Sequence, residues 1–327
     1  MSDPTTFSRR SFLGAAAAGS AALALPGAVW AQEGIVHLSV GFPPGGSGDI
    51  FARILADGLR EELNRPVVVE NRPGAGGLTV AVNFLRAPKD GSHIMLATGS
   101  TAVAAPISRA KPPYNPMEDF QWIALLSNAP FVIAINPTLP VRNLKELVAY
   151  AKERPGKMSY GHAGMGTTVH LAAEMFKDAA GISVVDVPYA GSAPAITDTI
   201  ANNVQFIVET SGTLLPHHKS GRLRIISLLA DSREKINPDI PTAREEGYEL
   251  IAGTYNLLAV PAGTPAAVVE NLGKATTRVM DNPAILDKLV GLGITPVRNS
   301  NPAQARAFMQ AEIARWQPLV KKLNIAL

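Results

Sequence analysis

The fold of this chain is decided by residues 40–49, VGFPPGGSGD, which join a strand pattern to a helix pattern through a glycine-rich turn. Before the turn, residues 35–41 alternate apolar and polar side chains, as a strand does. After it, apolar residues recur at the spacing of one helix face: Ile50, Ile54, Leu55, Leu59 and Leu63. A strand, a tight turn and an amphipathic helix are the opening of an α/β fold.

The turn is a candidate anion site. Backbone N–H groups at a helix start carry partial positive charge, and glycines let a ligand come close to them. The alternative is a plain strand–helix turn with Ser47 or Asp49 as the N-cap. The candidate ligand-binding residues of this turn are Phe42, Pro44, Gly45, Gly46 and Ser47.

Two further glycine-rich loops follow predicted strands. The second, MSYGHAGMGTT at residues 158–168, contributes the candidates His162, Ala163, Gly164, Met165, Gly166 and Thr167. The third, VPYAGSAP at residues 187–194, contributes Tyr189 and Gly191. Two anion sites in different halves of an α/β chain suit a dicarboxylate, or one carboxylate with a polar tail.

Strand and helix patterns alternate along the whole chain. Further strands are predicted at 66–70, 93–98, 131–135, 158–162, 182–187, 204–208 and 224–229. Helices are predicted at 144–153, 169–180 and 193–201, and over most of 265–323 with breaks near Pro283 and Pro296. The alternation predicts α/β architecture with largely parallel sheets. With 327 residues, two domains are expected, and the chain crosses between them near Phe131 and Tyr255.

Composition excludes several classes of protein. The chain is 46% apolar and 17% charged, so we expect a large core and no disorder. Its 30 basic and 27 acidic residues are scattered, which does not suit nucleic acid. Cysteine is absent, which rules out disulfides and thiolate sites.

The N-terminus reads as an export signal. Residues 8–13, SRRSFL, resemble the twin-arginine motif and precede an apolar stretch that is broken by Pro26 and Gly27. We expect cleavage after Ala31 and a periplasmic mature chain; the alternative is an N-terminal anchor that stays attached. No later segment has the ~20 apolar residues that span a bilayer, so no membrane insertion of the mature chain is expected.

Motifs of catalysis are missing. The sequence has no phosphate-loop, G-x-S-x-G or H-E-x-x-H pattern, and its partial dinucleotide motif at residues 164–169 lacks the last glycine. His170 and Glu174 lie one helical turn apart, but no third metal ligand is evident. We therefore expect no catalytic residue, no metal and no cofactor. Of the other polar candidates, His162 either contacts a ligand or braces its loop, and Glu209 is either a solvated strand end or a cleft residue that pairs with a ligand amine or hydroxyl.

Seven short motifs together resemble the Bug-type receptors, the substrate-binding proteins of the tripartite tricarboxylate transporter family. They are VGFPPGGS at 40–47, VVENRPGAGG at 68–77, KDG at 89–91, PGKMSY at 155–160, VPY at 187–189, LPH at 215–217 and VPAGTP at 260–265. They occur in order along the mature chain, and the run at residues 70–77 is the most specific.

The resemblance implies a type II periplasmic-binding-protein fold with a ligand cleft between two lobes. Lobe 1 is expected at 32–130 plus 253–327 and lobe 2 at 131–252, after the signal peptide at 1–31. It further implies a small organic acid held mainly by backbone N–H groups and waters, with Thr98 and Ser100 also lining the cleft. Two membrane permease subunits are the implied partners, and we expect the receptor to be a monomer.

Several residues depart from the family pattern. Met165 replaces a common Asn, Leu78 a polar residue, and Glu209 an Asp or smaller residue, while Tyr255 and Asn256 occupy a stretch that often holds Trp. Ligand identity is therefore the least transferable property. Two other functions stay open: a sensor subunit that hands the same ligand to a signalling partner, and an exported enzyme.

Overall fold

Strand β1 (Val36–Val40), helix α2 (Ser47–Leu63) and strand β2 (Val67–Asn71) confirm the pattern predicted around residues 40–49. The helix buries Phe51, Leu55 and Leu59, which share one face at spacings of four residues. It ends at Asn64, whose left-handed conformation (φ 48°) is one that asparagine tolerates better than most residues.

The computed structural model describes residues 34–235, 237–323 and 325. The predicted signal peptide therefore lies outside the described residues. After β2 come a 3₁₀ turn (Ala75–Gly77), α3 (Leu78–Phe84), β3 (His93–Thr98), a π-helical turn (Ser100–Ala104), α4 (Ala105–Ile107), β4 (Phe120–Ile135), α5 (Leu144–Lys152), β5 (Ser159–His162) and α6 (Thr168–Ala180). Then follow β6 (Val185–Pro188), α7 (Ser192–Ile200), β7 (Phe206–Thr210), α8 (Ser211–Lys219), β8 (Arg224–Leu229), β9 (Gly253–Pro261), α9 (Ala266–Asp281), α10 (Pro283–Gly291), β10 (Thr295–Pro296) and α11 (Pro302–Lys322).

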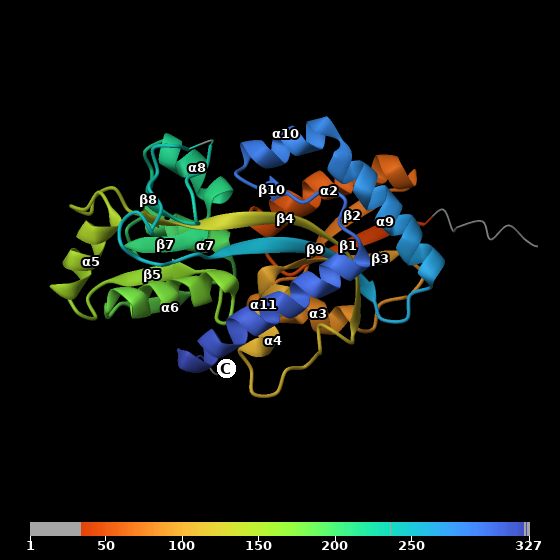
Figure 1. The fold of residues 1–327 in the computed structure, drawn as a ribbon, viewed down its shortest axis with the longest axis horizontal. Coiled ribbons are helices and arrows are strands. Elements are labelled where there is room, and N and C mark those ends of the chain that lie inside the picture. The colour runs from red at the N-terminus through yellow and green to blue at the C-terminus, as the bar shows by residue number, and fades with distance from the viewer. Residues whose placement is uncertain (1–33, 236, 324, 326–327) are drawn as a thin grey trace, which may run out of the picture. The chain divides into compact units, whose positions relative to one another are not determined.

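The described strands form one sheet in the order β2-β1-β3-β9-β4-β7-β5-β6, with β8 and β10 also paired to β4 (Figure 1). Each end of this order is parallel: β1 pairs with β2 and β3, and β5 pairs with β6 and β7. All pairs made by β4 and β9 are antiparallel. The expectation of largely parallel sheets is therefore wrong for the centre, because these two strands run back between the parallel sections.

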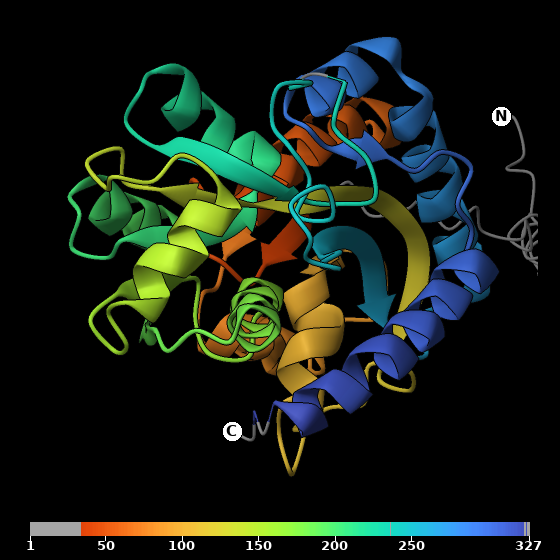
Figure 2. The same cartoon turned by 60° about the vertical axis from the view of Figure 1, so that its left-hand side comes forward.

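Strand β4 links the two sections by changing partners along its length. Its first part, 120–130, pairs with β9, and its last part, 131–135, pairs with β7 and β8. The sequence predicts only the last part, because residues 120–130 are buried on both faces and do not alternate. Both strands curve strongly where they run together (Figure 2).

The C-terminal helices confirm the predicted breaks. Pro283 opens α10 and Pro296 lies in β10. Helix α11 begins with a capping box between Asn301 and Gln304, which satisfies backbone donors at both positions. Of the helices described, none is long and apolar enough to cross a membrane.

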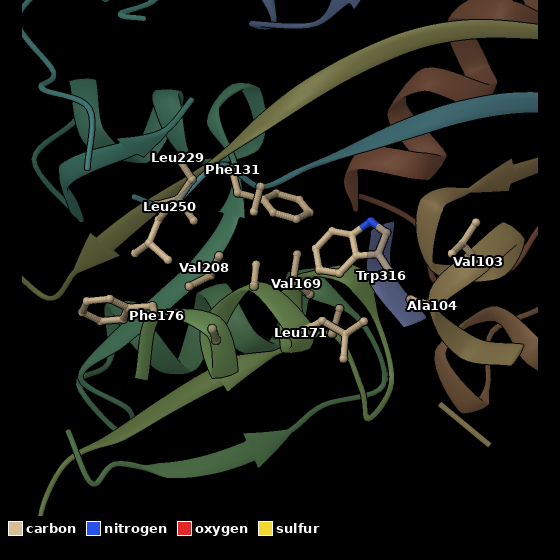
Figure 3. Packing of buried hydrophobic residues seen from close by; sticks show 14 of the residues in the cluster. Val103, Ala104, Phe131, Val169, Leu171, Phe176, Val208, Leu229, Leu250 and Trp316 are labelled. Atoms are coloured by element: carbon tan, nitrogen blue, oxygen red, sulfur yellow. The ribbon is translucent and has the colours of Figure 1, made fainter. Parts of the chain in front are cut away.

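One hydrophobic cluster joins residues from both sections of the sheet. Trp316 of α11 is 1% exposed and lies near Phe131 of β4 and Val169 of α6 (Figure 3). Its indole N–H donates to the Glu312 carboxylate at 2.9 Å, so the ring is buried without leaving its polar atom unpaired. The C-terminal helix α11 therefore packs against residues of both sections of the sheet.

Replacing Trp316 with alanine should destabilise the protein by about 3–5 kcal/mol, because it leaves a cavity and removes the indole donor of the Glu312 carboxylate. Denaturant unfolding followed by circular dichroism measures this change. The control is Val290→Ala at a side chain that is 47% exposed, where we expect less than ~0.5 kcal/mol. An equal loss of unfolding free energy in the two variants would show that the packing of Trp316 does not stabilise the core.

Candidate functional site

The first glycine loop lies between β1 and α2, and a hydrogen bond to the Asp49 carboxylate stabilises it. The Asp49 carboxylate accepts the Gly45 N–H at 2.9 Å and hydrogen bonds from Arg53 and Asn71. Burial opposes ionisation of Asp49, but these hydrogen bonds outweigh it and lower the pKa of the carboxyl. The helix N-cap is Gly46, so neither Ser47 nor Asp49 caps the helix by its side chain.

The start of α2 keeps unpaired donors. Gly46 provides no side-chain cap, and within the described residues no acceptor is paired with the backbone N–H of Ser47 or Gly48. Both residues line a cavity. The first turn of α2 therefore presents N–H groups and the positive end of the helix dipole to that cavity.

The second glycine loop differs, because several of its backbone donors are already bonded. The Gly164 N–H donates to His162 Nδ1 at 3.3 Å, and the Gly166 N–H donates to His170 Nδ1 at 3.2 Å. The Thr168 N–H donates to the Ser100 hydroxyl at 3.0 Å. This loop therefore contributes shape and hydroxyl groups to the site more than free backbone donors.

His162 and His170 form a buried pair beneath that loop. Their rings stack with centroids 4.6 Å apart, and both residues are at most 3% exposed. Burial, and then the neighbouring His170, lower the pKa of His162 to about 4, and burial also lowers the pKa of His170. Both rings are thus neutral near pH 7 and can accept the loop's N–H groups.

Among the described residues, His162, His170 and Asp186 have ligand atoms within 4.8 Å of one another. Their protonation does not suit a metal. Since each Nδ1 accepts a backbone N–H, each Nε2 carries the ring proton and offers no lone pair. Nor does the predicted partner of His170 join them, because the Glu174 carboxylate is bonded to Tyr160 and Lys177.

The cavity lies where the two sections of the sheet meet. The cavity is narrow, with a volume of about 30 Å³. The lining residues predicted from the sequence are Phe42, Gly46, Ser47, Thr98, Ser100, Ala163 and Glu209. Lining residues that were not named individually as candidates are Gly48, Phe131, Thr168, Val169, Ser192, Thr254 and Asn256, of which Thr168 and Ser192 lie within the predicted loops.

Four of these residues show how the sequence signal differs between positions. Thr168 and Ser192 are the first residues of α6 and α7, directly after loops that the sequence singles out, so their positions were readable. Thr254 and Asn256 lie on one face of β9, which reaches the cavity only because β9 runs antiparallel to β3 and β4. No local signal marks them.

Glu209 of β7 is fully buried, and its carboxyl group lines the cavity. It accepts hydrogen bonds from the Ser192 hydroxyl and, at 2.8 Å, from the Thr210 N–H. Burial raises the pKa of Glu209, and hydrogen bonds from Ser192, Thr210 and Ser47 oppose the shift without cancelling it. The solvated strand end is therefore excluded in favour of the cleft position.

Other predicted site residues lie around the cavity without lining it: Pro44, Gly45, His162, Gly164, Met165, Gly166, Thr167, Tyr189 and Gly191. Two of them have evident structural tasks. The Tyr189 hydroxyl donates to Asp198 at 2.6 Å, and Thr167 is the N-cap of α6. Their place in ligand binding stays a prediction.

Glycines hold the two sections of the sheet in close contact beside the cavity. A Cβ atom at Gly191 would lie 2.4 Å from Pro43 Cγ, and one at Gly212 would lie 1.5 Å from the Leu292 carbonyl oxygen. Carbon atoms do not approach this closely, so any side chain at Gly212 forces the two segments apart.

The buried histidines predict acid sensitivity. An unfolded histidine titrates near pH 6.5, whereas folded His162 titrates near 4, so the unfolded state binds more protons between these values. Stability must therefore fall as the pH falls through this window. Between pH 7 and 5, His162 alone should remove roughly 2 kcal/mol.

His162→Asn tests this, because asparagine can still accept the Gly164 N–H but does not titrate. Urea unfolding at several pH values should show a shallower loss between pH 7 and 5 than in the wild type. His218→Asn is the control, since His218 Nδ1 also accepts a backbone N–H, from Ile225 at 3.2 Å, on a half-buried ring. Parallel pH profiles for wild type and His162→Asn would contradict the assignment.

The comparisons with known proteins agree over nearly the whole described chain. The family model described as "Tripartite tricarboxylate transporter family receptor" matches residues 51–325. Protein BugT of Bordetella pertussis is 33% identical over 294 residues, which cover 89% of this chain and 90% of BugT.

Solved structures give the same result. The periplasmic binding protein BugD has a TM-score of 0.86 at 31% identity, covering 90% of this chain and 99% of BugD. A protein of R. palustris solved with adipate has a TM-score of 0.86 at 28% identity, covering 89% of this chain and 98% of its own. These neighbours confirm the predicted fold class, a two-lobed α/β periplasmic-binding-protein fold.

Proposed function

Because the chain belongs to the tripartite tricarboxylate transporter family of receptors, we propose that it is a periplasmic receptor that captures a small carboxylate-bearing molecule and does no chemistry on it. The observation that carries the proposal is the cavity between the two sections of the sheet, which is lined by Ser47 and Gly48, whose backbone N–H groups have no partner among the described residues. The adipate bound to the R. palustris relative supports an acid as ligand.

The carboxylate would bind at the start of α2. The Ser47 and Gly48 N–H groups donate there, and the buried Thr98 hydroxyl, which has no partner among the described residues, donates beside them. Ser100 and Thr168 close the cavity through their hydrogen-bonded hydroxyls, 3.0 Å apart. Binding in this way uses neutral donors and no cationic side chain.

The lobes would be residues 32–130 plus 253–327 and residues 131–252. Two observations support these limits. Strand β4 exchanges β9 for β7 and β8 at Phe131, and the Phe131 N–H donates to the carbonyl of Ala252, where the chain returns. A hinge at these neighbouring positions would open the narrow cavity to a ligand and close it again.

Export by the twin-arginine route would deliver the receptor, as a monomer, to two permease subunits in the membrane. The direct test of the function is calorimetric titration of the purified protein with mono- and dicarboxylates, aromatic acids and amino acids. We expect one acid bound per chain, and mass spectrometry should recover that acid unchanged. Binding of no acid, or release of a chemically altered one, would overturn the proposal.

Gly212→Ala should weaken binding of the tightest acid at least about tenfold, a cost of about 1.4 kcal/mol, because the added methyl group clashes with Leu292 and holds the lobes apart. Titration calorimetry gives the affinity, and thermal unfolding shows whether the lobes stay folded. Gly291→Ala is the matched control, since a Cβ atom there has no neighbour within 4 Å. Unchanged affinity in a folded Gly212→Ala protein would show that this contact does not belong to the ligand-bound form.

A further inference from the structure

Among the buried acids of the described residues, Glu209 and Glu246 have no ion-pair partner, and of these two only Glu209 lines the cavity. Asp49 is paired with Arg53 and Glu312 with Arg315. Within the described residues, no Lys, Arg or His nitrogen lies within ion-pair distance of Glu209. Its partners are hydroxyl groups and one backbone N–H, all of them neutral.

The position of this carboxyl group places an acceptor inside the ligand cavity. Ser192, which donates to it, is the first residue of α7, and Ser47, which also interacts with it, is the first residue of α2. Glu209 therefore lies between two helix starts that would otherwise attract a ligand anion. One anion position in the cavity is already filled by the protein itself.

A second acceptor faces the same cavity. Asn256 is 5% exposed, and its side-chain NH₂ donates to the Ser127 hydroxyl at 3.0 Å, while its oxygen has no partner among the described residues. A buried acceptor without a donor is costly, so a ligand donor at this oxygen would stabilise the bound form. The cavity thus offers donors at Thr98 and the start of α2, and acceptors at Glu209 and Asn256.

We propose that Glu209 makes this site select an acid that also carries an ammonium group and reject an acid with a second carboxylate. The inference rests on the proposed function and names the class of its ligand. The ligand's carboxylate takes the N–H groups of Ser47 and Gly48, and its ammonium donates to Glu209 and to the Asn256 oxygen.

Charge explains the discrimination. An ammonium group gives the buried Glu209 carboxylate the cation that the described protein lacks, and a hydrogen bond to a charged group is the stronger kind. A second ligand carboxylate would instead lie beside a like charge in a site with little water, and one of the two would have to take up a proton. A hydroxyl group satisfies the acceptors but not the charge, so it should bind with intermediate affinity.

The test uses acids matched in length that differ at one end. One set is adipate, 5-hydroxypentanoate and 5-aminopentanoate; a shorter set is succinate, 3-hydroxypropanoate and 3-aminopropanoate. Titration calorimetry at pH 7 should show the amino acid of at least one set binding about tenfold to a hundredfold tighter than its dicarboxylate. Equal or tighter binding of the dicarboxylates in both sets would overturn the inference while leaving the proposed receptor function intact.

Glu209→Gln removes the charge and keeps the shape. It should reduce or reverse the preference, raising affinity for the dicarboxylate and lowering it for the amino acid by about tenfold each. Glu246→Gln is the matched control: Glu246 is also a buried acid, it accepts the Leu144 N–H at 2.8 Å, and it does not line the cavity. Its preferences should equal those of the wild type.

Each result is decisive. A Glu209→Gln protein that stays folded by circular dichroism and keeps the wild-type preference would overturn the inference. If no acid of either set binds to the wild type or to Glu209→Gln, the proposed carboxylate site fails and the inference fails with it. If Glu209→Gln does not fold, the wild-type ranking within each matched set still decides the question.

Discussion

The backbone hydrogen bonds of strand β4 are the constraint on which the rest of this structure depends. One strand pairs with β9 over residues 120–130 and with β7 and β8 over residues 131–135. Because the ladder is continuous, the two parallel sections must meet at the point where the partners change. The cavity forms there, and residues at or just beyond the carboxyl ends of β1, β3, β5 and β7 line it.

That arrangement determines the electrostatics of the site. Three donors of the second glycine loop are bonded to two neutral histidines and a serine, so these donors add little positive potential to the cavity. At the first loop, the Ser47 and Gly48 N–H groups have no partner among the described residues, and the buried Glu209 carboxylate interacts with Ser47. The cavity is therefore polar and contains both unpaired N–H donors and a buried acidic acceptor.

Close contact between the two sections depends on the absence of side chains. Gly191 lies against Pro43, and Gly212 lies against the Leu292 carbonyl group. These contacts involve segments far apart in the sequence, and larger residues would keep the cavity open. The buried Trp316 holds the same two sections together from the side of α11. Stability and recognition therefore draw on the same junction.

Local chemistry made much of this predictable. Alternation along residues 36–40 and helical spacing along residues 47–63 indicate their elements directly, and glycines at 45 and 46 mark the turn where the α2 donors are exposed. Seven short motifs were enough to indicate the family and the fold class, which the comparisons confirm. Local patterns located Ser47 and Glu209, and the family resemblance added Thr98 and Ser100; the structure brings all four into one cavity.

The sequence by itself determined many of the strands and helices, the positions of the glycine turns and the kind of protein, because neighbouring residues indicate each of these. It did not predict α3, α8 or β9. Only the tertiary structure decided the antiparallel centre of the sheet, the bonding of second-loop donors to His162 and His170, and the position of Asn256 in the cavity that Glu209 also lines. These features join residues that are far apart along the chain. The spacing of residues within one segment does not predict which distant residues that segment will contact.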